Sequence, residues 1–111
     1  MSTYTAKSEL TMIELPAIAP PRWTQEQAVA FEAARECLGH VIAICVASIA
    51  DEETKASPDA ERLAELETEL AALTAKRREL KLTDAEGVAQ VRAFYGAQVR
   101  SYREQRQPAA A

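Results

Sequence analysis

Very few side chains in this sequence could do chemistry, because the chain contains a single histidine, His40. A nucleophilic triad needs such a base, and a metal site would have to combine His40 with Cys37 and Glu36. Ferritin-like bundles use Glu-x-x-His, whereas Glu36 and His40 are four positions apart, and the chain has no Cys-x-x-Cys pair. We therefore interpret Glu36 and His40 as an exposed pair one helical turn apart. We expect no catalytic residue, no metal site and no cofactor.

The two cysteines, Cys37 and Cys45, lie eight positions apart in one predicted helix. Eight residues of helix advance the chain by about 12 Å, and a disulfide needs Cα atoms within about 7 Å. The two cysteines therefore cannot pair with each other. Both lie among apolar residues, where thiols are usually buried and unreactive.

The remaining polar groupings also disfavour catalysis. Glu61, Glu65 and Glu69 share one helical face, which we interpret as solvated because nothing there would desolvate the acids. The three glycines lie singly within predicted helices, so the chain has no phosphate-binding loop. A nucleic-acid helix is a further interpretation, although the net charge of −4 disfavours it. Its residues would be Arg92, Tyr95, Arg100, Tyr102, Arg103 and Arg106.

The apolar content limits the core that could position any site. Hydrophobic residues make up 48% of the 111 residues, but 23 of them are alanine and only 22 are Leu, Ile, Val or Phe. About 20% for these four types is near the level below which chains tend not to fold alone. We therefore expect one domain with a thin core. With three glycines and no asparagine, a turn-rich β sandwich is not expected.

The predicted fold class is all-α, with three helices that each begin at a capping residue. Thr24 begins the first helix as part of a capping box with Gln27. Ser57 caps the second helix ahead of a proline, and Thr83 caps the third as part of another capping box. The predicted ranges are 24–50, 58–81 and 84–106, which together form the three-helix domain 24–106.

Apolar side chains cover about half of the first helix, more than the stripe of about 100° on a typical surface helix. Such a helix needs two neighbours. The second helix carries a leucine seam with Arg77 in one slot, which we interpret as internal core rather than as a dimer zipper. The apolar face of the first helix consists of Phe31, Ala34, Leu38, Val41, Ile42, Cys45 and Ile49, widened by Cys37, Ile44 and Val46. The seam consists of Leu63, Leu66, Leu70, Leu73 and Leu80, and the third helix presents Val88, Val91, Phe94, Tyr95, Val99 and Tyr102.

Only Leu82 and Thr83 separate the second and third predicted helices. So short a link predicts an antiparallel hairpin, against which the first helix packs. The acidic first half of helix 58–81 then faces the arginines at positions 100, 103 and 106, and these opposite charges favour the hairpin. The acidic run 51–53 is expected to end the first helix, because acids fit poorly at a helix C-terminus.

Residues 1–23 are predicted to form an extended N-terminal arm, because Pro16, Pro20 and Pro21 disfavour a regular helix. Residues 107–111 are predicted to be a flexible tail. The arm carries several larger apolar residues, so it either packs on its own domain or docks on a partner. Either the arm or a second chain is expected to finish covering the first helix. The candidate partner-binding residues are Leu10, Met12, Ile13, Leu15, Ile18, Trp23, Arg100 and Arg103.

The most apolar stretch, residues 37–50, is 14 residues long. A membrane span takes about 20 residues, so we interpret this stretch as a buried helix. The first 20 residues lack the long apolar run of a signal peptide, and we expect a cytoplasmic protein. Nine arginines against four lysines, with abundant alanine, are typical of a GC-rich bacterial genome.

In architecture the chain resembles the small acidic helical antitoxins of bacterial toxin–antitoxin pairs. The epsilon antitoxins that neutralise zeta toxin kinases are one such three-helix type. The resemblance spans residues 24–106 and rests on size, acidity and the helices beginning at Thr24, Ser57 and Thr83. It implies a non-enzymatic, antitoxin-like or immunity-like protein that sterically blocks the substrate or nucleotide site of a toxin.

Two other classes of function remain open. One is a homo-oligomeric helical assembly or scaffold protein, such as a phage or secretion-system component, that uses the leucine seam between chains. The other is a nucleic-acid accessory protein that uses the arginines of the third helix.

Overall fold

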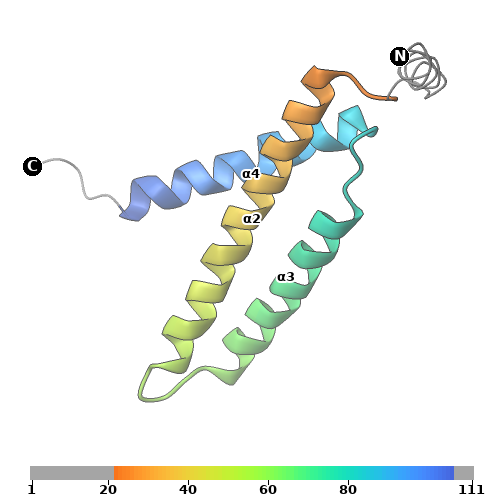
Figure 1. The fold of residues 1–111 in the computed structure, drawn as a ribbon. Coiled ribbons are helices and arrows are strands. Elements are labelled where there is room, and N and C mark those ends of the chain that lie inside the picture. The colour runs from red at the N-terminus through yellow and green to blue at the C-terminus, as the bar shows by residue number, and fades with distance from the viewer. Residues whose placement is uncertain (1–21, 107–111) are drawn as a thin grey trace, which may run out of the picture.

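The structure is a computed structural model that describes residues 22–106. Within them the chain forms three α-helices and no strand. These are α2 (Gln25–Glu53), α3 (Ala60–Glu79) and α4 (Ala85–Arg106). Helix α2 contacts both other helices (Figure 1), which confirms the predicted all-α fold with a long first helix between two neighbours. The predictions for residues 1–21 of the arm and for the tail 107–111 lie outside the described residues.

The core lies where α3 and α4 meet one face of α2. Leu38 of α2 is completely buried and is the largest side chain in that condition among the described residues. The core is thin, as the composition predicts, because only nine apolar residues are buried among the described residues, seven of them valine or leucine. Its buried apolar members are Ala34, Leu38, Val41, Cys45, Leu66, Leu73, Val88, Val91 and Val99.

The leucine seam of α3 faces α2. Leu66 and Leu73 are buried, and Leu70 and Leu80 pack against the same cluster while staying partly exposed. Arg77 occupies its predicted slot in this seam, where it is half-buried and its Nε donates a hydrogen bond to the carbonyl oxygen of Arg35 at 3.4 Å. Four of the five predicted seam leucines therefore belong to the internal core, whereas Leu63 is only partly buried and lies outside this cluster.

The start of α2 is the predicted capping box. The Thr24 hydroxyl accepts a hydrogen bond from the backbone N–H of Gln27 at 3.1 Å, and the Gln27 side chain accepts one from the backbone N–H of Thr24 at 2.8 Å. These two bonds satisfy donors that the first turn of a helix would otherwise leave free. They also fix the direction in which the chain enters α2.

The start of α3 differs from the prediction. Asp59, not Ser57, is the N-cap, and its carboxylate accepts hydrogen bonds from the backbone N–H groups of Glu61 and Arg62 at 3.0 and 3.2 Å. Pro58 therefore precedes the helix and is not its first residue. A carboxylate carries a full negative charge at the positive end of the helix dipole, so Asp59 competes well against the serine hydroxyl.

The start of α4 is also one residue later than predicted. Asp84, and not Thr83, places its carboxylate against the backbone N–H of Gly87 at 3.0 Å, and α4 begins at Ala85. The physical reason is the same as for α3, because an aspartate stands next to the hydroxyl residue and can accept the same orphan donor with a charged group.

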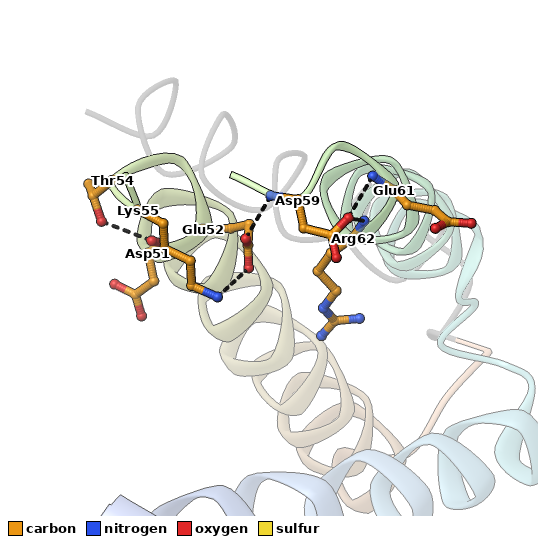
Figure 2. A network of polar contacts seen from close by, with 7 residues as sticks. All are labelled: Asp51, Glu52, Thr54, Lys55, Asp59, Glu61 and Arg62. Atoms are coloured by element: carbon orange, nitrogen blue, oxygen red, sulfur yellow. Dashed lines mark hydrogen bonds and ion pairs between the residues drawn. The ribbon is translucent and has the colours of Figure 1, made fainter. Parts of the chain in front are cut away.

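The end of α2 corrects the expectation that the acidic run would stop the helix. Helix α2 continues through Glu53, and Glu52 is buried with 7% of its surface exposed. One Glu52 oxygen accepts from the Lys55 ammonium at 2.8 Å, and the other accepts from the backbone N–H of Asp59 at 3.0 Å (Figure 2). Glu52 is therefore tolerated at a helix C-terminus because its charge is paired and faces the approaching start of α3.

Direct packing between α3 and α4, as expected for a hairpin, does not occur. No Cα atom of one helix lies within 8 Å of the other. Helix α3 runs back along α2, whereas α4 crosses α2 in another direction (Figure 1). Helix α3 ends at Glu79, and Leu80 adopts an extended conformation with ψ of 132°, so the link is five residues long rather than two. The apolar stripes of α3 and α4 therefore pack separately on the wide apolar face of α2.

Candidate functional site

The side chains best suited to catalysis or metal binding do not lie close together. Glu36 and His40 are exposed on α2, and Cys37 is half-buried between them and the core. Within residues 22–106 the only ion pair joins Lys55 to Glu52, so the expected pairing of Glu36 with His40 is not formed. No group of three His, Cys, Asp or Glu side chains in that range is placed to hold a metal ion.

Cys45 is the one buried thiol among the described residues. Its Sγ donates a hydrogen bond to the backbone oxygen of Leu66 at 3.3 Å. Burial, with a smaller contribution from the Glu69 carboxylate, raises the pKa of the Cys45 thiol from its usual 9.0. The thiol therefore stays protonated at neutral pH and is a poor nucleophile. The expected burial is therefore confirmed for Cys45, whereas Cys37 is only half-buried.

A polar groove of about 270 Å³ lies above Cys45, between the first half of α3 and the second half of α4. Arg62 and Glu69 line its α3 side, and Tyr102 lines its α4 side. Hydroxyl and amide side chains share the rest of the lining with apolar side chains, and no histidine is among them. The remaining lining residues are Val41, Ile44, Ser48, Leu66, Gln98, Ser101 and Gln105.

A second groove, of about 680 Å³, separates the end of α3 from the start of α4. Phe94 stands in its lining with 60% of its surface exposed, and its ring meets the Tyr95 ring edge-on at a centroid distance of 4.9 Å. The groove is bordered by both signs of charge, including Lys76 and Glu79.

The sequence predicted that Phe94 lies on the buried face of the third helix, and this prediction is wrong because Phe94 is exposed. Phe94 lies at the edge of that apolar stripe, where only a direct α3–α4 contact would have covered it.

A third hollow, of about 730 Å³, lies at the start of α2, on the side turned away from α3 and α4. Trp23 and Val29 line it, with 46% and 63% of their surfaces exposed, and Glu32 and Glu36 complete its edge. Gln25, Ala28 and Ala33 are the other lining residues. Trp23 was a candidate partner-binding residue in the sequence, but Val29 was not.

The predicted partner-binding residues are not gathered in one place. Leu10, Met12, Ile13, Leu15 and Ile18 lie outside the described residues. Trp23 lies just before the start of α2. The starts of α2 and α4 are neighbours, because residues of both line one small hollow. Arg100 and Arg103 are exposed in the last turns of α4, at the other end of that helix.

Arg100 and Arg103 do not face the acidic half of α3 as predicted. The flank of α4 that borders the α3 grooves carries Gln98, Ser101 and Tyr102, and the two arginines are absent from the lining of both grooves. At 100° per residue they lie on the opposite flank. The charge pairing that favoured the hairpin is therefore not formed, because α4 is rotated to place its valines on α2.

Helix α2 has the length and composition of a membrane-crossing helix. Its most apolar window of 18 residues has a mean hydropathy of 1.5, and 22% of that window is buried by the rest of the described chain. The same properties also belong to a core helix of a globular protein. The low buried share shows that α3 and α4 cover only one side of α2.

In comparisons with known proteins, no family model, no curated protein and no solved structure matches this chain.

Proposed function

We propose that this chain is a non-enzymatic protein-binding module that neutralises a partner protein by covering its working surface, as a small antitoxin or immunity protein does. The main support is the exposure of four large apolar side chains. Trp23, Val29, Val46 and Phe94 are 46%, 63%, 49% and 60% exposed. Single exposed apolar residues are ordinary, but these accompany a long apolar helix that is covered on one side only. Trp23 and Val29 line one hollow, and exposed apolar side chains that are grouped in this way are typical of interaction sites.

The chemistry of the described residues also supports binding rather than catalysis. The Cys45 thiol is buried with a raised pKa, and His40 is exposed on another side of α2. General acid–base or nucleophilic catalysis needs such groups within hydrogen-bonding reach of one another. The grooves offer surface for contact, and the large apolar anchors that dominate protein interfaces are available on it.

A cytoplasmic location is part of the same proposal. Charged or polar side chains at Glu32, Arg35, Glu36 and His40 interrupt the first half of α2. A membrane span that included them would place ionisable groups in the bilayer, where a charged residue costs about 2.5 to 3.5 kcal/mol at the centre and less toward either surface. The contacts with α3 and α4 instead cover one side of α2 with leucine and valine side chains, as in the core of a globular protein.

Site-specific photo-crosslinking in the native cell tests this function. The photoreactive residue benzoylphenylalanine replaces Phe94 in one variant and Trp23 in another, and it replaces Glu67 on the exposed side of α3 in a control. We expect adducts with a second protein from position 94 or 23 and none from position 67. If that partner inhibits growth when expressed alone, co-expression of this chain should restore growth. Absence of adducts from both test positions would contradict the proposal.

A homo-oligomeric scaffold is the second candidate, and one observation favours it. The surface of α4 around Phe94 is flat and uncharged, with alanine, glutamine and serine neighbours. Two copies could join through this surface without bringing like charges together, as a symmetric interface requires. Crosslinked adducts of twice the chain mass from position 94, with no second protein present, would select this function over neutralisation.

A further inference from the structure

The hollow at the start of α2, defined by Trp23, Val29, Glu32 and Glu36, combines apolar anchors with negative charge. Trp23 and Val29 are 46% and 63% exposed, and the two glutamates follow at helical spacing along the same side. This side lies opposite Ala34 and Leu38, the residues that α2 buries against its neighbours. The described part of the chain leaves it uncovered.

Trp23 is held in place by the local structure. It immediately precedes Thr24, whose capping box with Gln27 fixes the backbone there. Trp23 and Ala28 line the same hollow, in the positions that form a hydrophobic staple across a helix start. An anchor that is ordered before binding loses less conformational entropy in a complex, and tryptophan is among the residues that contribute most to interfaces.

The charge of the hollow selects the class of partner. Two carboxylates line it, and its lining contains no lysine, arginine or histidine. Nucleic acids and anionic membrane surfaces carry phosphate groups, which these carboxylates would repel. We infer that this hollow binds a cationic amphipathic segment of a partner protein, whose apolar side chains contact Trp23 and Val29 while its lysines or arginines pair with Glu32 and Glu36.

The other surfaces do not identify a partner in this way. The groove that contains Phe94 is bordered by Lys76, Lys81, Glu79 and Asp84, so it favours neither sign of charge. The flat surface on the outer side of α4 has no charged residue in its lining. The inference on the α2 hollow rests on the proposed protein-binding function and names the chemistry of the partner.

A peptide titration tests the inference directly. The probe is a helical peptide of about four turns that places leucine on one face and lysine on the other, and a second peptide carries glutamate in place of lysine. Trp23 is the only tryptophan of the chain, so its emission reports on the hollow in the full-length protein. We expect the lysine peptide to shift this emission to shorter wavelength, with an affinity that falls as salt is added.

Matched variants locate the binding site, with affinities measured by fluorescence anisotropy of a labelled lysine peptide. The double variant E32Q/E36Q should bind about three- to tenfold more weakly, since each exposed ion pair contributes modestly. The control E61Q/E65Q removes the same charge at the same spacing from the exposed side of α3, and it should bind as the unmodified protein does. Trp23→Ala should weaken binding by about tenfold or more. Val29→Ser gives a second test of the apolar contact if Trp23→Ala alters the circular dichroism spectrum.

Three results would overturn the inference. They are an unchanged Trp23 emission, equal binding of the glutamate peptide, and an equal loss of affinity in E61Q/E65Q and E32Q/E36Q, which would indicate general charge attraction. Any of these leaves the proposed function standing if photo-crosslinking from position 94 still captures a protein partner. Failure of crosslinking from both positions would instead remove the proposed function.

Discussion

Replacing Leu38 by alanine is expected to remove much of the stability of this fold. Leu38 is completely buried where α2 meets its neighbours. The truncation removes about three carbon groups from the core, at about 0.8 kcal/mol for each, and the cavity left behind raises the loss to about 3 to 4 kcal/mol. A domain of this size has a free energy of unfolding of about 4 to 13 kcal/mol, and a thin core places it toward the lower end. The melting temperature should fall by more than about 12 °C.

The matched control is Val29→Ala on the same helix, where 63% of the side chain is exposed. Alanine has the higher helix propensity, so we expect a change within about 0.5 kcal/mol. Urea unfolding followed by circular dichroism at several protein concentrations measures both variants. If Val29→Ala destabilises the protein as much as Leu38→Ala does, the outer side of α2 is covered in solution and the reasoning is refuted. A loss that grows with protein concentration would identify a second copy as the cover.

Three further predictions use the same urea assay. Hydrogen bonds from the Lys55 side chain and from the backbone N–H of Asp59 lower the pKa of Glu52 from its usual 4.5. The ionised form of Glu52 therefore stabilises the fold above about pH 4.5. This stabilisation is lost as the pH falls through the lowered pKa. Glu52→Gln should accordingly be less stable than the unmodified protein at pH 7 and should lose less stability on acidification; equal pH profiles would argue against this role. Asp59→Ala should cost about 1 kcal/mol while Ser57→Ala costs almost nothing, and the reverse order would restore the serine as the cap. Gly96→Ala should stabilise the protein by up to about 1 kcal/mol, because alanine has the higher helix propensity and its Cβ would meet its nearest neighbours at 3.5 and 3.8 Å. Gly87→Ala should not stabilise the protein, because its Cβ would lie 2.9 Å from the carboxylate carbon of Asp84, which caps α4. Equal effects of the two substitutions would contradict this prediction.

Part of the candidate site could be predicted from the sequence. The sequence correctly predicts the capping box of Thr24 and Gln27, which places the candidate residue Trp23 directly before a helix start. Val29 and Phe94 could not be identified in the same way, because an apolar residue on a helix is exposed or buried according to its neighbours. Phe94 is exposed because α3 lies too far from α4 to cover it.

The buried carboxylate also required the tertiary structure. In the sequence, Glu52 belongs to an acidic run at the end of a helix, where its charge opposes the dipole. Its burial depends on the path of the chain through residues 54–59, which brings Lys55 and the backbone of Asp59 to its two oxygens (Figure 2). No periodic pattern records such a turn.

By itself, the sequence determined the number and type of the elements. Hydrophobic periodicity and capping residues act within a few residues of one another, so three helices, their approximate bounds and the thin core could be derived from local rules. The tertiary structure alone decided how the helices meet. Helices α3 and α4 each pack their apolar stripe on the wide face of α2, because that face gains more burial than the weak, exposed charge pairs of a hairpin could supply. The packing of α4 on α2 sets the orientation of α4. That orientation in turn leaves Phe94, Arg100 and Arg103 exposed.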